Sequence, residues 1–329
     1  MRATKIRTTA LSILNSLDLM GFFLVFLRSS RAYAKVHKKT GNQIILNIVK
    51  PFIFLFYTVL SAPVLLKRRV TVPSISIFIT SRCTLRCRDC SNMIPYYDTP
   101  SDVRLEEIKQ HMLNFLEGID MLYNISIIGG EPFLYDELGS LLDFLLMQEK
   151  IKYIKIITNG TLLPREEWLS ALKSDRVNVV ISNYKYSYKL EECFGILNDH
   201  GIDTTVLKED NQWLELGGVY YRSYTHNQLK RRFYSCPMRV CKILIHGRLY
   251  VCGRSATSDN LGFIPCSNKH GSMEYIDLTK SDSKRIRNDI RKLFQVQSLT
   301  ACNYCNGVTA TTKYITPAIQ CNGTIRPEL

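Results

Sequence analysis

Three cysteines lie within eight positions, in the stretch ITSRCTLRCRDCSN at residues 79–92. Their spacing is C-x3-C-x2-C, at Cys83, Cys87 and Cys90. A structural zinc site needs four ligands, whereas this loop offers three, and no histidine occurs between residues 38 and 110. Three thiolates can hold three irons of a cubane iron–sulfur cluster and leave the fourth iron open. The loop therefore predicts a catalytic cluster; a zinc knuckle with a distant ligand and buried structural cysteines are the alternatives.

The elements around this loop must position it. TVPSISIFIT at 71–80 reads as a buried strand directly before the cysteines, and after Arg69 strand and helix patterns alternate. The predicted strands are 74–80, 125–128, 153–158, 177–182 and 204–207. The predicted helices are 104–118 (with Ser101-Asp102 as its N-cap), 137–148, 164–174 and 189–199. Repeated βα units predict a parallel sheet, open or closed into a barrel, with its chemistry at the carboxyl ends of the strands.

Polar motifs end three of the later strands. ISIIGGEPF at 125–133 places Gly-Gly-Glu-Pro at a strand end, where glycines expose the backbone and a carboxylate can accept a hydrogen bond from an ammonium group. IKIITNGT at 154–161 and VVISNY at 179–184 end two further strands with hydroxyl and amide side chains. The motifs are therefore expected at the same edge of the sheet as the cysteines.

In this order, the cysteine loop and the three motifs resemble the signature of the radical SAM superfamily, over roughly residues 72–235. The resemblance implies a partial (β/α)6 TIM-like barrel and a [4Fe–4S] cluster on the three cysteines. It also implies that S-adenosyl-L-methionine (SAM) binds the open iron and is cleaved with an electron from an external donor such as flavodoxin or ferredoxin. The implied SAM contacts are Asp89, Gly129, Gly130, Glu131, Pro132, Thr158, Asn159, Ser182 and Asn183. Asp89 departs from the family pattern, which often has an aromatic residue there.

Further cysteines follow once the βα pattern ends, in CPMRVCKILIHGRLYVC and CNYC. Gly247 in the first of these stretches is placed for a tight hairpin. The arrangement resembles the twitch form of the SPASM-type auxiliary domain, and the resemblance implies one additional [4Fe–4S] cluster. Its implied ligands are Cys236, Cys252, Cys302 and Cys305. Cys241 is the alternative to Cys236, and tetrahedral zinc is the alternative to iron and sulfide.

The amino-terminal part has a different composition from the rest. Residues 1–70 hold 12 Lys and Arg against the single acidic Asp18, within a chain of net charge +14. Their apolar stretches, at 11–27 and 51–66, are shorter than the ~20 residues that a spanning helix needs. We predict that this segment lies on the surface of the cytoplasmic membrane, with helices that cap the main domain as the alternative.

These patterns divide the chain into three parts: a basic apolar segment at 1–70, a radical SAM core at 71–235, and an auxiliary-cluster domain at 236–329. The 11 cysteines fall in local groups, which suits metal ligation in a reducing compartment. We therefore expect a cytoplasmic protein of the α/β class, and no nucleic-acid partner.

The leading hypothesis for the function is a radical SAM oxidoreductase or modifying enzyme that abstracts hydrogen from a small or carbohydrate-like substrate. A peptide-modifying maturase, of the kind that acts on ribosomally made peptides, is the alternative within the class. A membrane-tethered electron-transfer or sensing protein is the alternative from another class. No catalytic acid or base stands out; Tyr184, Arg222 and Arg254 lie near motif ends and are candidates to face the substrate.

Overall fold

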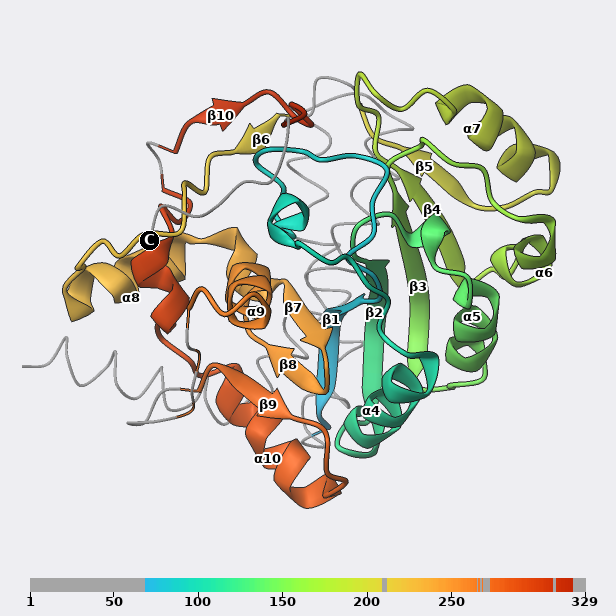
Figure 1. Ribbon diagram of the computed structural model, residues 1–329. Coiled ribbons are helices and arrows are strands. Elements are labelled where there is room, and N and C mark those ends of the chain that lie inside the picture. Colours follow the sequence, from blue (N-terminus) through green and yellow to red (C-terminus); the bar gives the residue numbers. More distant parts are fainter. Residues whose placement is uncertain are drawn as a thin grey trace, which may run out of the picture. The chain divides into compact units, whose positions relative to one another are not determined.

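An eight-stranded sheet lies at the centre of the described residues in the computed structural model (Figure 1). Its strand order is β5-β4-β3-β2-β1-β7-β8-β9. The strands are β1 (Thr71–Phe78), β2 (Met121–Ile128), β3 (Ile151–Thr158), β4 (Val177–Ile181), β5 (Thr204–Val206), β7 (Lys242–Ile245), β8 (Arg248–Tyr250) and β9 (Tyr275–Asp277). β7 runs parallel to β1, and β3, β4 and β5 run parallel to one another, whereas β8 is antiparallel to both β7 and β9. The sheet is mostly parallel, so the predicted α/β class is confirmed.

The structure describes residues 69–208, 212–264, 266, 268, 273–309 and 312–321. The chain forms two compact units, Met1–Pro73 with Ile119–Tyr123, and Ser74–Gly118 with Asn124–Leu329. All site residues considered below belong to the second unit. The membrane contact predicted for residues 1–70 lies, but for its last two residues, outside the described residues. Among the helices of the described ranges, none is both long enough and apolar enough to cross a membrane.

Helices follow the strands as the alternating pattern predicts. They are α4 (Leu105–Glu117), α5 (Leu138–Leu146), α6 (Leu169–Leu172) and α7 (Leu190–Asp199), and later α8 (His226–Ser235), α9 (Gly253–Asn260) and α10 (Ser283–Leu293). α5 packs on β3, α6 on β4 and α7 on β5. In α4 the residues Ile108, Met112 and Phe115 recur at helical spacing and are buried, which places one apolar face of the helix in the core.

The cap predicted for α4 is wrong. The helix begins after Arg104, which makes no side-chain cap hydrogen bond. Asp102 instead accepts hydrogen bonds from Thr80 and Arg82 at the end of β1. Its carboxylate is therefore engaged in positioning the start of the cysteine loop and not in capping the helix.

The strands after residue 236 extend the same sheet. β7 and β8 form a hairpin whose two turn residues, His246 and Gly247, have φ of 43° and 73°. Positive φ at both turn positions fits the right-handed twist of the strands, so the hairpin predicted at Gly247 is confirmed. Ile243, Ile245 and Tyr250 of this hairpin join a buried cluster with Phe78 of β1.

Candidate active site: two cysteine sets around one cavity

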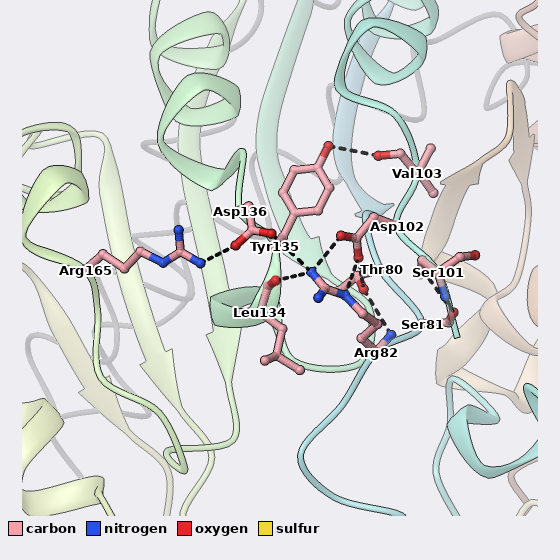
Figure 2. Close-up of polar contacts among 10 residues, drawn as sticks. All are labelled: Thr80, Ser81, Arg82, Ser101, Asp102, Val103, Leu134, Tyr135, Asp136 and Arg165. Atoms are coloured by element: carbon pink, nitrogen blue, oxygen red, sulfur yellow. Dashed lines mark hydrogen bonds and ion pairs between the residues drawn. The ribbon is translucent and has the colours of Figure 1, made fainter. Parts of the chain in front are cut away.

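The loop that carries the first cysteines starts in a polar network at the end of β1 (Figure 2). Asp102 accepts hydrogen bonds from Thr80 Oγ1 at 2.5 Å, from Arg82 Nε at 2.9 Å and from Arg82 Nη2 at 2.7 Å. Arg82 Nη2 also donates to the carbonyl of Leu134, just beyond β2. Because Arg82 immediately precedes Cys83, these contacts fix the point at which the loop leaves the strand.

The same network continues on both sides of Arg82 (Figure 2). The Ser81 amide donates to the Ser101 carbonyl at 2.9 Å, and the Ser101 amide donates to Ser81 Oγ at 2.8 Å. Arg82 lies 3.8 Å from the carboxylate of Asp136, which also pairs with Arg165. These contacts join the end of β1 to two other segments. One lies just before α4, at Ser101 and Asp102, and the other lies after β2, at Leu134 and Asp136.

Two glycines let the end of β2 approach this loop at backbone distance. The Gly130 amide donates to the Thr80 carbonyl at 2.7 Å, and Asn92 donates to the Gly129 carbonyl at 2.7 Å. A Cβ atom on Gly129 would collide with the Thr80 carbonyl oxygen, and one on Gly130 with the Arg82 carbonyl oxygen. Glycine is therefore required at both positions by close packing of one backbone on another.

The Glu131 carboxylate joins the end of β2 to the end of β3. It is fully buried and accepts hydrogen bonds from the Phe133 amide at 3.0 Å, Thr158 Oγ1 at 2.7 Å and the Asn159 amide at 2.8 Å. Burial raises the pKa of this carboxyl to about 7, against the lowering effect of the three hydrogen bonds. The side chain is committed to these donors, so its role here is to hold the two motifs together.

Asn159 extends from the end of β3 to the cysteine loop. Its Nδ2 donates to Thr84 Oγ1 at 3.0 Å and lies 3.6 Å from Cys83 Sγ. Its Oδ1 accepts from the Thr161 amide at 3.0 Å and from the Thr161 hydroxyl at 2.6 Å. These bonds orient the amide so that an N–H group faces the sulfur, where it stabilises thiolate charge.

Residues 318–321, which we call the C-terminal strap, pair with the other side of the loop through an antiparallel bridge between Cys87 and Gln320. The Arg86 amide donates to Gln320 Oε1 at 2.7 Å, and Gln320 Nε2 donates to Cys87 Sγ at 3.4 Å. The thiol of Cys321 donates to the Arg86 carbonyl at 2.9 Å. The strap therefore supplies a second N–H group to a sulfur of the first cysteine set.

The first three thiols are poorly suited to carry charge without a bound cation. The pKa of Cys83 and Cys87 is raised to about 12 and that of Cys90 is raised, mainly by burial, and the charges of neighbouring thiols contribute to the increase at all three. A thiolate becomes favourable when a metal binds it, because ligation displaces the proton. Three thiols on one loop, of a buried Cys87 and half-buried Cys83 and Cys90, with side-chain N–H donors at two of the sulfurs, fit an iron–sulfur cluster.

The second cysteine set is gathered from three segments. Cys236 follows α8, Cys252 precedes α9, and Cys302 and Cys305 lie in and directly after the 3-10 helix η5 (Thr300–Tyr304). The pKa of Cys252 is raised to about 12, mainly by burial, with a contribution from the charges of Cys305 and Cys236. The charges of Cys252 and Cys305 likewise raise the pKa of Cys302. Burial raises the pKa of Cys241, the charge of Lys242 lowers it and the charge of Cys236 raises it; because Cys241 also lines the cavity described next, the choice of Cys236 over Cys241 stays a prediction.

Both cysteine sets line one cavity of about 330 Å³. The predicted SAM contacts on its wall are Gly129, Gly130, Thr158, Asn159 and Ser182. The predicted contacts that are not on its wall are Asp89, Glu131, Pro132 and Asn183. Asp89 is exposed and pairs with Arg88 at 3.0 Å. Of the candidates to face substrate, Tyr184 and Arg254 line the cavity and Arg222 does not.

Within the described residues, no three His, Cys, Asp or Glu side chains converge closely enough to hold one metal ion. A cubane cluster spreads its ligands over several metal atoms, and cysteine thiolate is the donor that such clusters use.

Residues 77–185 match the radical SAM superfamily. The chain carries a radical SAM domain, the class of domain that uses a [4Fe–4S] cluster and SAM. Among curated relatives, it is 31% identical over 117 residues to GTP 3′,8-cyclase of Limosilactobacillus fermentum, covering 34% of each chain. It is 27% identical over 160 residues to the antilisterial bacteriocin subtilosin biosynthesis protein AlbA of Bacillus subtilis, covering 41% of this chain and 33% of that one. The matches thus span about one third of the length of these relatives.

Solved structures of similar arrangement include BtrN in complex with AdoMet and 2-DOIA, at 18% identity and a TM-score of 0.46. That match covers 71% of this chain and 93% of BtrN. SuiB of Streptococcus suis bound to S-adenosylmethionine matches at 18% identity and a TM-score of 0.35, over 48% of this chain and 39% of SuiB.

Several residues on or beside the site escaped sequence reasoning. Arg232 and Arg239 line the cavity, and their closeness in sequence to Cys236 is the signal that could have found them. Asp102 and Gln320 act from segments far from the cysteines in sequence. No local pattern marks either of them, because their roles depend on how the chain folds back.

Proposed function

We propose that this chain is a radical SAM enzyme that abstracts hydrogen from a C–H bond of a small or carbohydrate-like substrate, with help from an auxiliary [4Fe–4S] cluster. The observation that carries the proposal is the shared cavity, because the three thiols of one loop, which itself offers no fourth cysteine, face the same space as a second set of cysteines. When bound, the cofactors supply reductive SAM cleavage, radical hydrogen abstraction and a redox partner for net oxidation.

The residues of the chain have separable roles in this proposal. Cys83, Cys87 and Cys90 hold the first cluster and leave one iron for SAM. Gly129, Gly130, Thr158, Asn159 and Ser182 form the wall on which SAM lies, with backbone and hydroxyl groups available for hydrogen bonds. Cys236, Cys252, Cys302 and Cys305 hold the second cluster. The apolar lining from Trp213, Leu216 and Phe233 limits the entry of water, as expected for a site that protects reactive species.

The direct test is SAM cleavage by the full-length chain. The protein is reconstituted anaerobically with iron and sulfide and incubated with SAM and dithionite, and 5′-deoxyadenosine is measured by chromatography. We expect release of the nucleoside by the parent chain and none by the triple variant C83A/C87A/C90A. Cys193→Ala is the matched control, because Cys193 is buried in α7 and is not on the cavity wall.

Two results would contradict the proposal. One is nucleoside release that persists in the triple variant at the level of the Cys193→Ala control. The other is a Mössbauer spectrum of the SAM-free protein in which every iron has the parameters of full thiolate ligation, because the mechanism needs one iron without a protein ligand.

A peptide-modifying activity is the second candidate, and the match to a subtilosin biosynthesis protein favours it. The match to GTP 3′,8-cyclase favours a small polar substrate instead. The two are separated by which class of compound increases 5′-deoxyadenosine release above the basal level and acquires a mass change. Nucleotide sugars and sugar phosphates form one panel, and synthetic precursor-like peptides form the other.

A further inference from the structure

We infer that the substrate carries a phosphate group, which Arg232, Arg239 and Arg254 bind on the cavity wall beside the second cysteine set. The inference rests on the proposed function and adds to it the chemical class of the substrate. These three arginines line the cavity, and among the described residues on its wall there is no Asp, Glu or Lys. The wall therefore presents positive charge without a carboxylate to balance it, and its other ionisable groups of opposite sign are the cysteine thiols assigned to the clusters.

The contacts of the arginines leave most of their donors available. Arg232 donates through Nη1 to the carbonyl of Asn306 and lies over the ring of Tyr224, with Cζ 3.9 Å from the ring centroid. Arg239 lies over the ring of Tyr234 at 5.5 Å. Carbonyl groups and ring faces carry no net charge, and a guanidinium has five N–H donors. Each arginine is thus held in place by uncharged partners that do not neutralise it.

Arg254 gives the sharpest sign of a missing acceptor. Its Nη2 donates to the Gly217 carbonyl at 2.6 Å, while its Nε is buried and has no hydrogen-bond partner within the described residues. A buried donor without an acceptor is costly and rare in native structures. Because Arg254 lines the cavity, an oxyanion bound there would give this donor an acceptor once the guanidinium turns toward it, and planar guanidinium groups match phosphate oxygens well.

The rest of the wall is suited to an uncharged organic body. Trp213, Leu216 and Phe233 are on the wall, and binding sites commonly combine an apolar lining with a few polar groups that fix orientation. A phosphorylated sugar or nucleoside fits this combination better than an uncharged sugar. The phosphate could belong to a soluble compound or to a lipid-linked one, since both present the same oxyanion.

The test measures binding of inorganic pyrophosphate to the full-length, reconstituted protein by anaerobic calorimetry. The variants are Arg232→Gln, Arg239→Gln and Arg254→Gln. Arg231→Gln is the matched control, because Arg231 is exposed on the same helix as Arg232 and is not on the cavity wall. We expect binding to the parent chain and to the control, weakening by about tenfold in each of Arg232→Gln, Arg239→Gln and Arg254→Gln, and unchanged iron content in all four variants. Glucose 1-phosphate and a polyprenyl phosphate in detergent are then compared, and whichever competes better with pyrophosphate identifies the source.

The inference is overturned if pyrophosphate does not bind, or if it binds the Arg232→Gln and Arg254→Gln variants as it binds the control. It is also overturned if these variants lose iron, since the arginines would then balance the charge of the second cluster. SAM cleavage is measured on the same samples. Cleavage without pyrophosphate binding removes this inference and leaves the proposed function, whereas binding without cleavage removes the proposed function.

Discussion

The two cysteine sets face the same cavity but are built in different ways. The first is a single loop held by backbone and side-chain bonds from the ends of β1, β2 and β3 and from the C-terminal strap. The second is assembled from segments that follow α8, precede α9 and surround η5. A local loop can hold its geometry by short-range contacts, whereas a dispersed set depends on the packing of the elements that bring it together.

Each region contains one fully buried carboxylate that joins its parts. Glu131 connects the ends of β2 and β3 near the first set. Glu274 accepts from the Thr300 amide at 2.6 Å and from Ser255 Oγ at 3.4 Å, and so connects η5 to α9 near the second set. Burial raises the pKa of both groups. The scaffold thus supports the local site and the dispersed site by the same device, a buried carboxylate that accepts hydrogen bonds from two elements.

The largest effect is expected from Gly130→Ala, a substitution that should disrupt the first cysteine set and leave the second intact. The added Cβ collides with the Arg82 carbonyl, which is rigid backbone, so the start of the first loop must shift. We expect iron to fall from about eight to about four per chain, no SAM cleavage, and a loss of about 2 kcal/mol in the free energy of unfolding. Iron assay, nucleoside release and denaturant unfolding measure these three quantities.

Gly195→Ala is the control for this prediction. A Cβ at Gly195, within α7, would meet nothing within 4 Å, so the variant should keep its iron and gain up to roughly 1 kcal/mol from better helix propensity. Equal iron content in the two variants would show that the first loop tolerates displacement.

The second set is tested by comparing Cys302→Ala with Cys241→Ala. Cys302 interacts electrostatically with two thiols of the set, Cys252 and Cys305, whereas the one thiol that shifts the pKa of Cys241 is that of Cys236. We expect Cys302→Ala to lose about half of the iron and to keep the EPR change that SAM causes at the first cluster. Cys241→Ala should keep all its iron. Loss of iron from Cys241→Ala alone would reverse the ligand assignment.

The first cysteine set depends on local contacts and the second on packing between distant elements. This difference also explains which parts of the fold and the site could be predicted from the sequence. The strands at 74–80, 125–128, 153–158 and 177–182 were predicted from short apolar runs, and the structure has β1 to β4 there with ends shifted by at most four residues. The motifs at their ends follow from local spacing, because chemistry at a parallel sheet gathers where the strands end. Local order in the sequence therefore carried most of the information about the first site.

Long-range partners could not be predicted in this way. Asp102 looked like a helix cap because its local context fits one, but its carboxylate is taken by Arg82 and Thr80. Gln320 lies 233 residues after the sulfur that it contacts, and the pairing of β7 with β1 has no local signature. Such contacts form between residues that are distant in the sequence, so the pattern of residues in a short stretch does not predict them.

A medium effect is expected from Glu131→Gln in the metal-free protein. The folded state raises the pKa of Glu131 from 4.5 to about 7 by burial, so between these values the folded chain holds a proton that the unfolded chain has released. The contribution of this group to stability is therefore present at acid pH and is lost as the pH rises through about 7. We expect the free energy of unfolding of the parent to fall by up to roughly 3 kcal/mol over this range relative to the variant, measured by denaturant unfolding at several pH values.

The control is Glu137→Gln, at an exposed position nearby, which should show the pH dependence of the parent. Identical pH profiles for Glu131→Gln and the parent would refute the prediction.

The smallest effect is expected from Gln320→Leu, which removes the N–H group 3.4 Å from Cys87 Sγ while keeping a side chain of similar size. Hydrogen bonds to cluster sulfurs favour the reduced, more negative state. The reduction potential of the first cluster should therefore become more negative by roughly tens of millivolts. The potential of the second cluster should not change, because, within the described residues, the strap contacts the first cysteine set and not the second. Redox titration followed by EPR measures both potentials in one sample, and Gln297→Leu, at an exposed position, is the control. Equal shifts at both clusters would mean that the variant acts through the whole fold, and the distinction between a locally held site and a dispersed one would fail at this contact.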